Sequence, residues 1–74
     1  MKSIEAVEKM LEMRGLRKAD LARRMNMDPR YVVMKLRQKD LGSSALAEMA
    51  RAMDCRVMLI PNGGRVPKGS IEIE

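Results

Sequence analysis

The chain has 74 residues, and its 15 lysine and arginine residues outnumber its 10 aspartate and glutamate residues, which gives a formal net charge of +5 at pH 7. It contains no histidine and one cysteine, which excludes zinc sets, Cys-His pairs and disulfide frameworks. No apolar run approaches the roughly 18 residues of a membrane span, and no signal peptide is recognisable. We therefore expect a small cytoplasmic protein with no membrane association, no metal, no cofactor and no enzymatic activity.

The first predicted element is a helix from Ser3 to Arg14, because Ile4, Val7 and Leu11 recur at helical spacing. Ser3 is expected to cap this helix and Gly15 to stop it. Its outer face is acidic, with Glu5, Glu8 and Glu12. We expect the helix to cover the core, and a role in binding a partner protein is the alternative.

The next stretch, LRKADLARRMNMDPRYVVMKLRQK, covers residues 16–39 and reads as two short helices joined by a tight turn. In the second helix Asp28 suits the N-cap, Pro29 suits the first helical position, and Val32 is expected to be buried. Asn26 lies in the bend, where a sharp reversal requires a positive φ that asparagine tolerates. The inward positions of the first helix are Ala19, Leu21, Ala22 and Met25.

This stretch also carries most of the excess positive charge. Only Asp20 and Asp28 oppose its cations, which are Arg17, Lys18, Arg23, Arg24, Arg30, Lys35, Arg37 and Lys39. A polyanion is the natural partner of such a segment.

The segment from Lys18 to Arg37 resembles the helix-turn-helix of the Cro/repressor (XRE) family of phage and bacterial regulators. In that pattern Ala22 fills the close-contact position, Asn26 takes the place of the turn glycine, and Val32 is the buried β-branched residue. Lys35 falls where a second buried residue would lie, so we expect Leu36 to pack there instead. The resemblance implies a mainly α, four-helix repressor-like DNA-binding domain, which we assign to residues 1–54.

The resemblance also implies separate roles in binding double-stranded DNA. Base reading would fall to the outward face of the second helix, at Pro29, Arg30, Val33, Met34 and Arg37. Arg30 is the best candidate for guanine, because a guanidinium can satisfy two major-groove acceptors at once. Tyr31 could either pack on the neighbouring helix or contact a phosphate. The other phosphate contacts would come from Arg17, Lys18, Lys35, Lys39, Ser43 and Ser44.

A fourth helix is predicted to begin after Ser43 or Ser44, either of which can cap it, and to run to about Met53. From residue 55 to residue 74 the pattern changes to a β extension. RVMLI is apolar and β-branched, and residues 71–74 alternate at period two. We expect two strands that contribute to dimerisation through Val57, Met58, Leu59, Ile60, Ile71 and Ile73. The pattern leaves open whether they pair within one chain or between two.

The expected function is sequence-specific binding of duplex DNA by a homodimer on an inverted-repeat operator, which represses transcription. The alternative is an antitoxin that binds both its operator and a partner toxin, because LAEMARAMDCRVMLIP resembles the ends of helix-turn-helix antitoxins. An autoregulator of a mobile element would use the same DNA chemistry. A pure protein-interaction module is disfavoured by the clustered charge.

Overall fold

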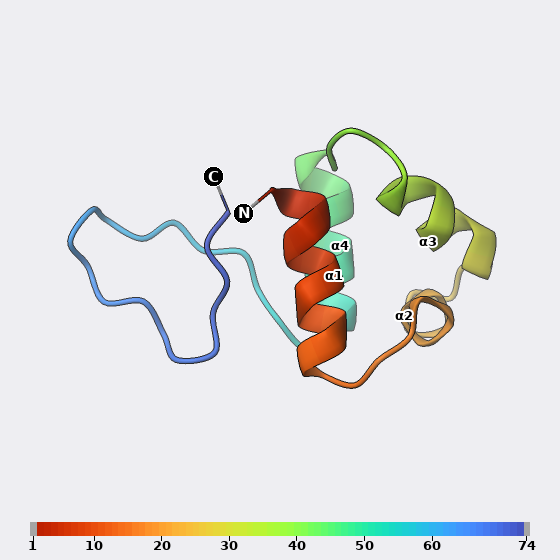
Figure 1. Ribbon diagram of the computed structural model, residues 1–74, viewed down its shortest axis with the longest axis horizontal. Helices are drawn as coiled ribbons and strands as arrows, with labels where there is room; N and C mark the ends of the chain where they lie inside the picture. Colours follow the sequence, from red (N-terminus) through yellow and green to blue (C-terminus); the bar gives the residue numbers. More distant parts are fainter. Residues whose placement is uncertain (1, 74) are drawn as a thin grey trace.

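The computed structural model describes residues 2–73, and these form four helices followed by an extension (Figure 1). The helices are α1 (Ser3–Met13), α2 (Lys18–Arg24), α3 (Pro29–Leu36) and α4 (Ser43–Ala52). The prediction of a mainly helical chain is confirmed. None of the helices in this part of the chain is long and apolar enough to cross a membrane.

Helices α1 and α4 run side by side in the same direction, and they separate two other parts of the chain (Figure 1). Helices α2 and α3 pack against each other on one side of this pair, and α2 also contacts α4. The extension, residues 55–73, lies on the other side. The surface of α3 is therefore remote from the extension.

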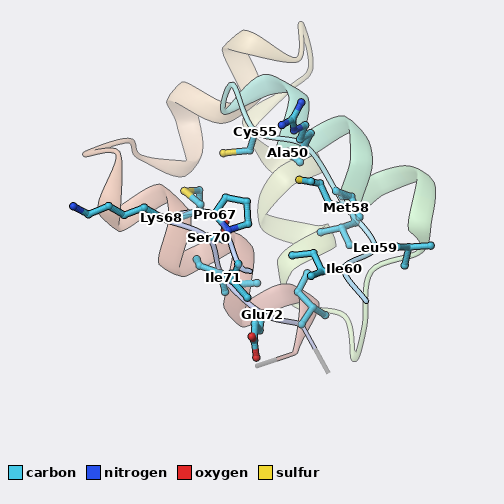
Figure 2. A pocket seen from close by; sticks show the side chains of 18 of the residues that line it. Ala50, Cys55, Met58, Leu59, Ile60, Pro67, Lys68, Ser70, Ile71 and Glu72 are labelled. Carbon is cyan, nitrogen blue, oxygen red and sulfur yellow. The ribbon is translucent and has the colours of Figure 1, made fainter. Parts of the chain in front are cut away.

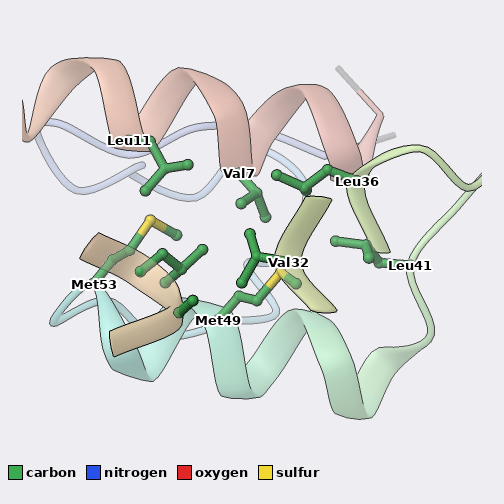
Figure 3. Packing of buried hydrophobic residues seen from close by; sticks show 9 residues of the cluster. Val7, Leu11, Val32, Leu36, Leu41, Met49 and Met53 are labelled. Carbon is green, nitrogen blue, oxygen red and sulfur yellow. The ribbon is translucent and has the colours of Figure 1, made fainter. Parts of the chain in front are cut away.

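A single core fills the space between the four helices (Figure 3). Val7 and Leu11 enter it from α1, and Met49 enters from α4 on the opposite side. The other buried members are Leu21, Ala22, Val32, Leu36, Leu41 and Met53. Methionine supplies two of the nine side chains, as expected for a chain that has no phenylalanine or tryptophan.

Helices α1, α2 and α4 end in the same way, each at a residue with positive φ. These residues are Gly15 (φ 66°), Asn26 (φ 58°) and Asp54 (φ 58°). In each case two amides fold back onto the last turn; at Asn26 they are Asn26 N–H to Arg23 O (3.1 Å) and Met27 N–H to Ala22 O (2.9 Å). The predicted stop at Gly15 and the predicted conformation of Asn26 are confirmed.

The predicted serine caps are wrong. Lys2 occupies the N-cap position of α1 and Gly42 that of α4, and neither makes a side-chain capping bond. Ser3 lies inside α1, where it is buried and bonded to the α3–α4 loop, and this tertiary contact takes its hydroxyl away from capping. Ala19 is also exposed rather than inward, because the buried stripe of α2 begins only at Leu21.

No strand forms within residues 2–73, so the strands predicted over residues 56–60 and 71–74 are absent from the described part of the single chain. The extension reverses in two separate turns, closed by Gly64 N–H to Pro61 O (2.9 Å) and Ser70 N–H to Pro67 O (3.2 Å). This two-step reversal makes an open loop (Figure 1) and leaves the apolar runs unpaired. Pairing between two chains stays a prediction. Met1 and Glu74, the outermost residues of the two predicted regions, lie outside the described residues.

Candidate functional site

Helix α3 is anchored by one face and exposed on the other. Its N-terminus forms as predicted, because Asp28 Oδ1 accepts the backbone N–H of Arg30 at 2.8 Å and Pro29 occupies the first turn. Val32 is completely buried and Leu36 is buried one turn later, whereas Met34 is 55% exposed. The core therefore fixes which face of α3 points to solvent.

That outward face forms a shallow hollow lined by residues from α3 and the position after it. The lining residues are the five that the sequence predicts for base reading, Pro29, Arg30, Val33, Met34 and Arg37. The hollow combines apolar side chains with two guanidinium-bearing arginines, and it is open to solvent. Such a surface presents both hydrogen-bond donors and apolar side chains to a ligand that binds along the exposed face of α3.

The Arg30 guanidinium is held by the carboxylate two residues before it. Its Nε–H donates to Asp28 Oδ1 at 3.3 Å and its Nη2–H donates to Asp28 Oδ2 at 3.2 Å. The Arg30 side chain is nevertheless 92% exposed. The side-chain bonds from Arg30 and then its backbone N–H lower the pKa of Asp28, so the carboxylate is ionised at neutral pH.

Tyr31 and Lys35 form a pair on the side of α3. Tyr31 is partly buried and packs against the core, which matches the packing alternative for this residue. The Lys35 Nζ lies over the tyrosine ring, 5.7 Å from its centroid. This contact holds the lysine stem against α3, and no carboxylate among residues 2–73 forms an ion pair with the Lys35 ammonium group.

The cations at the start of α2 are paired with acids. Asp20 accepts the backbone N–H of Arg17 (2.9 Å) and its Nε–H (3.3 Å), and these contacts lower the pKa of Asp20, the backbone bond most. The Lys18 Nζ lies 3.8 Å from Glu8 Oε2 of α1. In contrast, no ion pair within residues 2–73 involves Lys35, Arg37 or Lys39. The cations at the C-terminal end of α3 and in the loop after it therefore differ from those at the start of α2, which are paired with acids.

The α3–α4 loop is fastened to α1 by a small polar cluster. The buried Ser3 hydroxyl donates to Asp40 Oδ1, and the Leu41 N–H donates to Ser3 Oγ (3.2 Å) and to Asp40 Oδ1 (2.9 Å). The Ser3 bond and then the Leu41 bond lower the pKa of Asp40. The cluster positions the loop that carries Lys39 and leads into the exposed Ser43 and Ser44 at the start of α4.

The extension exposes apolar side chains around a second hollow, between itself, α1 and α4 (Figure 2). Leu59 lies at its edge and is 99% exposed. Ile60 and Ile71 are partly buried. Among the other predicted dimerisation residues, Val57, Met58 and Ile73 are exposed. The structure thus leaves these side chains open to a further protein surface.

The sequence reasoning missed two features of this site, the grip of Asp28 on Arg30 and the contact of Ser3 with Asp40. The first had a visible signal, because a carboxylate two residues before an arginine can reach its guanidinium. The second joins residues 37 positions apart and had none. In comparisons with known proteins, no family, curated protein or solved structure matches the chain.

Proposed function

We propose that the chain is a sequence-specific regulator that binds duplex DNA, with α2, the turn at residues 25–28 and α3 acting as a helix-turn-helix. The observation that supports it best is the two-faced packing of α3. Val32 and Leu36 fix the helix on the core, and the opposite face gathers Arg30, Met34 and Arg37 around one hollow. The major groove of B-DNA admits a helix presented in this way.

In this proposal α3 reads base edges from the major groove. The guanidinium groups of Arg30 and Arg37 donate to guanine, whose O6 and N7 are both acceptors on that side. Val33 and Met34 provide apolar contact to thymine methyl groups. Pro29 lies at the tip of the helix and has no backbone N–H to donate to a base.

Phosphate contacts come from the cations around this face. Lys35 and Lys39 are the strongest contributors, since no ion pair within residues 2–73 opposes them. Arg17 and Lys18 contribute less, because their contacts with Asp20 and Glu8 compete with phosphate. The α4 N-terminus, with Ser43 and Ser44, has no side-chain cap and offers amides to a phosphate. This binding is salt-sensitive and independent of base sequence.

We further propose that the protein acts as a homodimer on an inverted repeat and represses transcription by occupying a promoter. The exposed Val57, Met58 and Leu59 favour a protein partner at the extension. A second copy of the chain can pair its own extension there and cover the same side chains. A toxin protein is the alternative partner at this surface.

Selection of bound sequences from a random duplex pool, with the full chain, tests the proposal. We expect an inverted repeat whose half-sites lie about one helical turn apart, near 34 Å. A scrambled duplex of equal length is the control for charge. Equal binding to the selected and the scrambled duplex would reduce the protein to a general polyanion binder. A toxin encoded beside the chain and copurifying with it would favour the antitoxin alternative.

Deletion of Pro61–Glu74 tests the dimer. Because the extension lies on the far side of α1 and α4 from α3, the deletion leaves the reading face intact and is expected to weaken dimerisation and operator affinity together. Sedimentation at tens of micromolar and DNA titration measure the two effects, and circular dichroism checks that the helices form. A truncated chain that dimerises unchanged, or a full chain that sediments as a monomer, contradicts the prediction.

A further inference from the structure

The contact between Asp28 and Arg30 divides the guanidinium into a held edge and an open edge. A guanidinium has five N–H donors, and the Asp28 carboxylate takes one on Nε and one on Nη2. Both Nη1 protons and the outer Nη2 proton are left. The outer protons of Nη1 and Nη2 point the same way, along the direction of the side chain, and they form the other bidentate edge.

The carboxylate that holds Arg30 is itself fixed by α3. Asp28 Oδ1 accepts the backbone N–H of Arg30 at 2.8 Å as well as its Nε–H at 3.3 Å, so a single oxygen joins the helix cap to the guanidinium. The direction of the guanidinium is thereby tied to the axis of α3. The side chain points into solvent, where it is 92% exposed, beside the hollow lined by Val33 and Met34.

Folding stability does not account for this arrangement, because an ion pair between two exposed side chains stabilises a protein very little. Its physical effect is on the freedom of Arg30. A long flexible side chain loses rotamer freedom when it binds, and one that is already restrained loses less. The negative charge of Asp28 also repels phosphate, which weakens binding to DNA of any sequence.

We propose that Asp28 is a positioning residue for recognition of guanine: its carboxylate holds Arg30 by the Nε/Nη2 edge and presents the Nη1/Nη2 edge to guanine O6 and N7 at one position of each half-site. This inference rests on the proposed DNA-binding function and adds a specificity-determining residue to it. The Asp28 carboxylate is charged at neutral pH, as an ordinary aspartate is, and its contacts with Arg30 lower its pKa further. Asp28 thus raises the ratio of specific to non-specific binding.

Two substitutions separate the carboxylate from the helix cap. Asp28→Ser keeps a good N-cap and removes the carboxylate, whereas Asp28→Glu keeps a carboxylate and weakens the cap. A third variant, Asp20→Ser, is the control for charge, because Asp20 is another carboxylate that holds an arginine, at the start of α2 and away from the hollow. Thermal unfolding of each variant measures how much the N-cap contributes to the stability of the fold.

The measurement is competition between the duplex selected by the wild-type chain, its single-base variants at every position, and a scrambled duplex. For the wild type we expect a preference for guanine at one position of roughly tenfold or more, within the usual range for a bidentate contact. Asp28→Ser should reduce this preference at least threefold, leave other positions unchanged and bind the scrambled duplex more tightly. Asp28→Glu should retain the preference although it unfolds at a lower temperature. Asp20→Ser should strengthen binding to all duplexes equally.

An unchanged guanine preference in Asp28→Ser overturns the inference and leaves the proposed function standing. A loss of base preference that is equal at all positions and parallels the drop in unfolding temperature shows that Asp28 acts only as a helix cap. This result also overturns the inference. A wild-type chain with no preferred duplex overturns both this inference and the proposed function.

Discussion

Substitutions on the two faces of α3 should affect stability and DNA binding separately. Val32 is completely buried, and Val32→Ala removes two carbon atoms from the centre of the core. At about 0.8 kcal/mol per buried methylene, plus the cost of the cavity, the loss of folding free energy is about 2 to 3 kcal/mol. Met34 is 55% exposed two positions later, so Met34→Ala should change stability by no more than about 0.5 kcal/mol.

Urea denaturation followed by the helical circular dichroism signal measures both free energies. A domain of this size has about 4 to 11 kcal/mol of stability, so Val32→Ala should still be folded at room temperature, with a midpoint of thermal unfolding lowered by about 10 to 20 °C. Met34→Ala should unfold like the wild type and lose affinity for the selected duplex. If the two variants lose equal stability, or if Val32→Ala loses less than about 0.5 kcal/mol, the assignment of buried and exposed faces of α3 is wrong.

Three further predictions concern charge, pH and the turn. Lys18→Ala should weaken binding to selected and scrambled duplexes about equally and flatten the salt dependence by at most about one phosphate contact, because Glu8 competes for the lysine. Arg30→Ala should instead cost about 1 to 3 kcal/mol on the selected duplex and much less on the scrambled one. The pKa of Asp40 is lowered in the folded chain. Its contribution to stability is therefore present above the ordinary aspartate pKa of 3.8 and is lost as the pH falls through the folded pKa. The difference in stability between wild type and Asp40→Asn, from urea titrations at several pH values, should therefore shrink in acid. Asn26→Gly should match or exceed the wild type in stability, and Asn26→Ala should lose about 1 kcal/mol, because Asn26 has a φ of 58°.

Each of these predictions has an outcome that contradicts it. If Arg30→Ala weakens binding to both duplexes equally, Arg30 is only a phosphate contact. Base reading then falls to the other side chains of the hollow. A stability difference for Asp40→Asn that grows in acid means that the Ser3 contact does not favour the carboxylate. An Asn26→Ala variant as stable as the wild type means that the turn does not require a positive φ.

The parts of the fold that depend on neighbouring residues were predictable from the sequence. Asp28 and Pro29 start α3 through short-range geometry, Asn26 bends the chain through its own backbone preference, and Val32 and Leu36 recur one helical turn apart. The five candidate reading residues share one face for the same reason, and the structure brings them together around one hollow.

The parts that depend on distant residues were not predictable. A serine near a helix start is ordinarily a cap, but Ser3 instead bonds to Asp40 and Leu41, which only the packed structure brings within reach. Asp54 ends α4 with a positive φ, a role that no glycine or asparagine signalled. The predicted strands are absent from the single chain for a related reason. Period-two alternation shows which residues can form a strand, but a strand also needs a partner for its backbone amides.

If the protein binds DNA as proposed, the position of the unpaired extension limits how far apart the two half-sites can lie. The extension and α3 lie on opposite sides of α1 and α4, and the longest dimension of the chain is 39 Å. A dimer joined end to end through the extensions would span up to twice 39 Å and hold its α3 helices nearer to two turns of DNA than to one. Half-sites one turn apart come within reach if each extension crosses onto the partner instead. Crossing would give the backbone of residues 57–60 the partner that one chain does not supply, and it would cover Leu59, so the half-site spacing reports where the extension pairs.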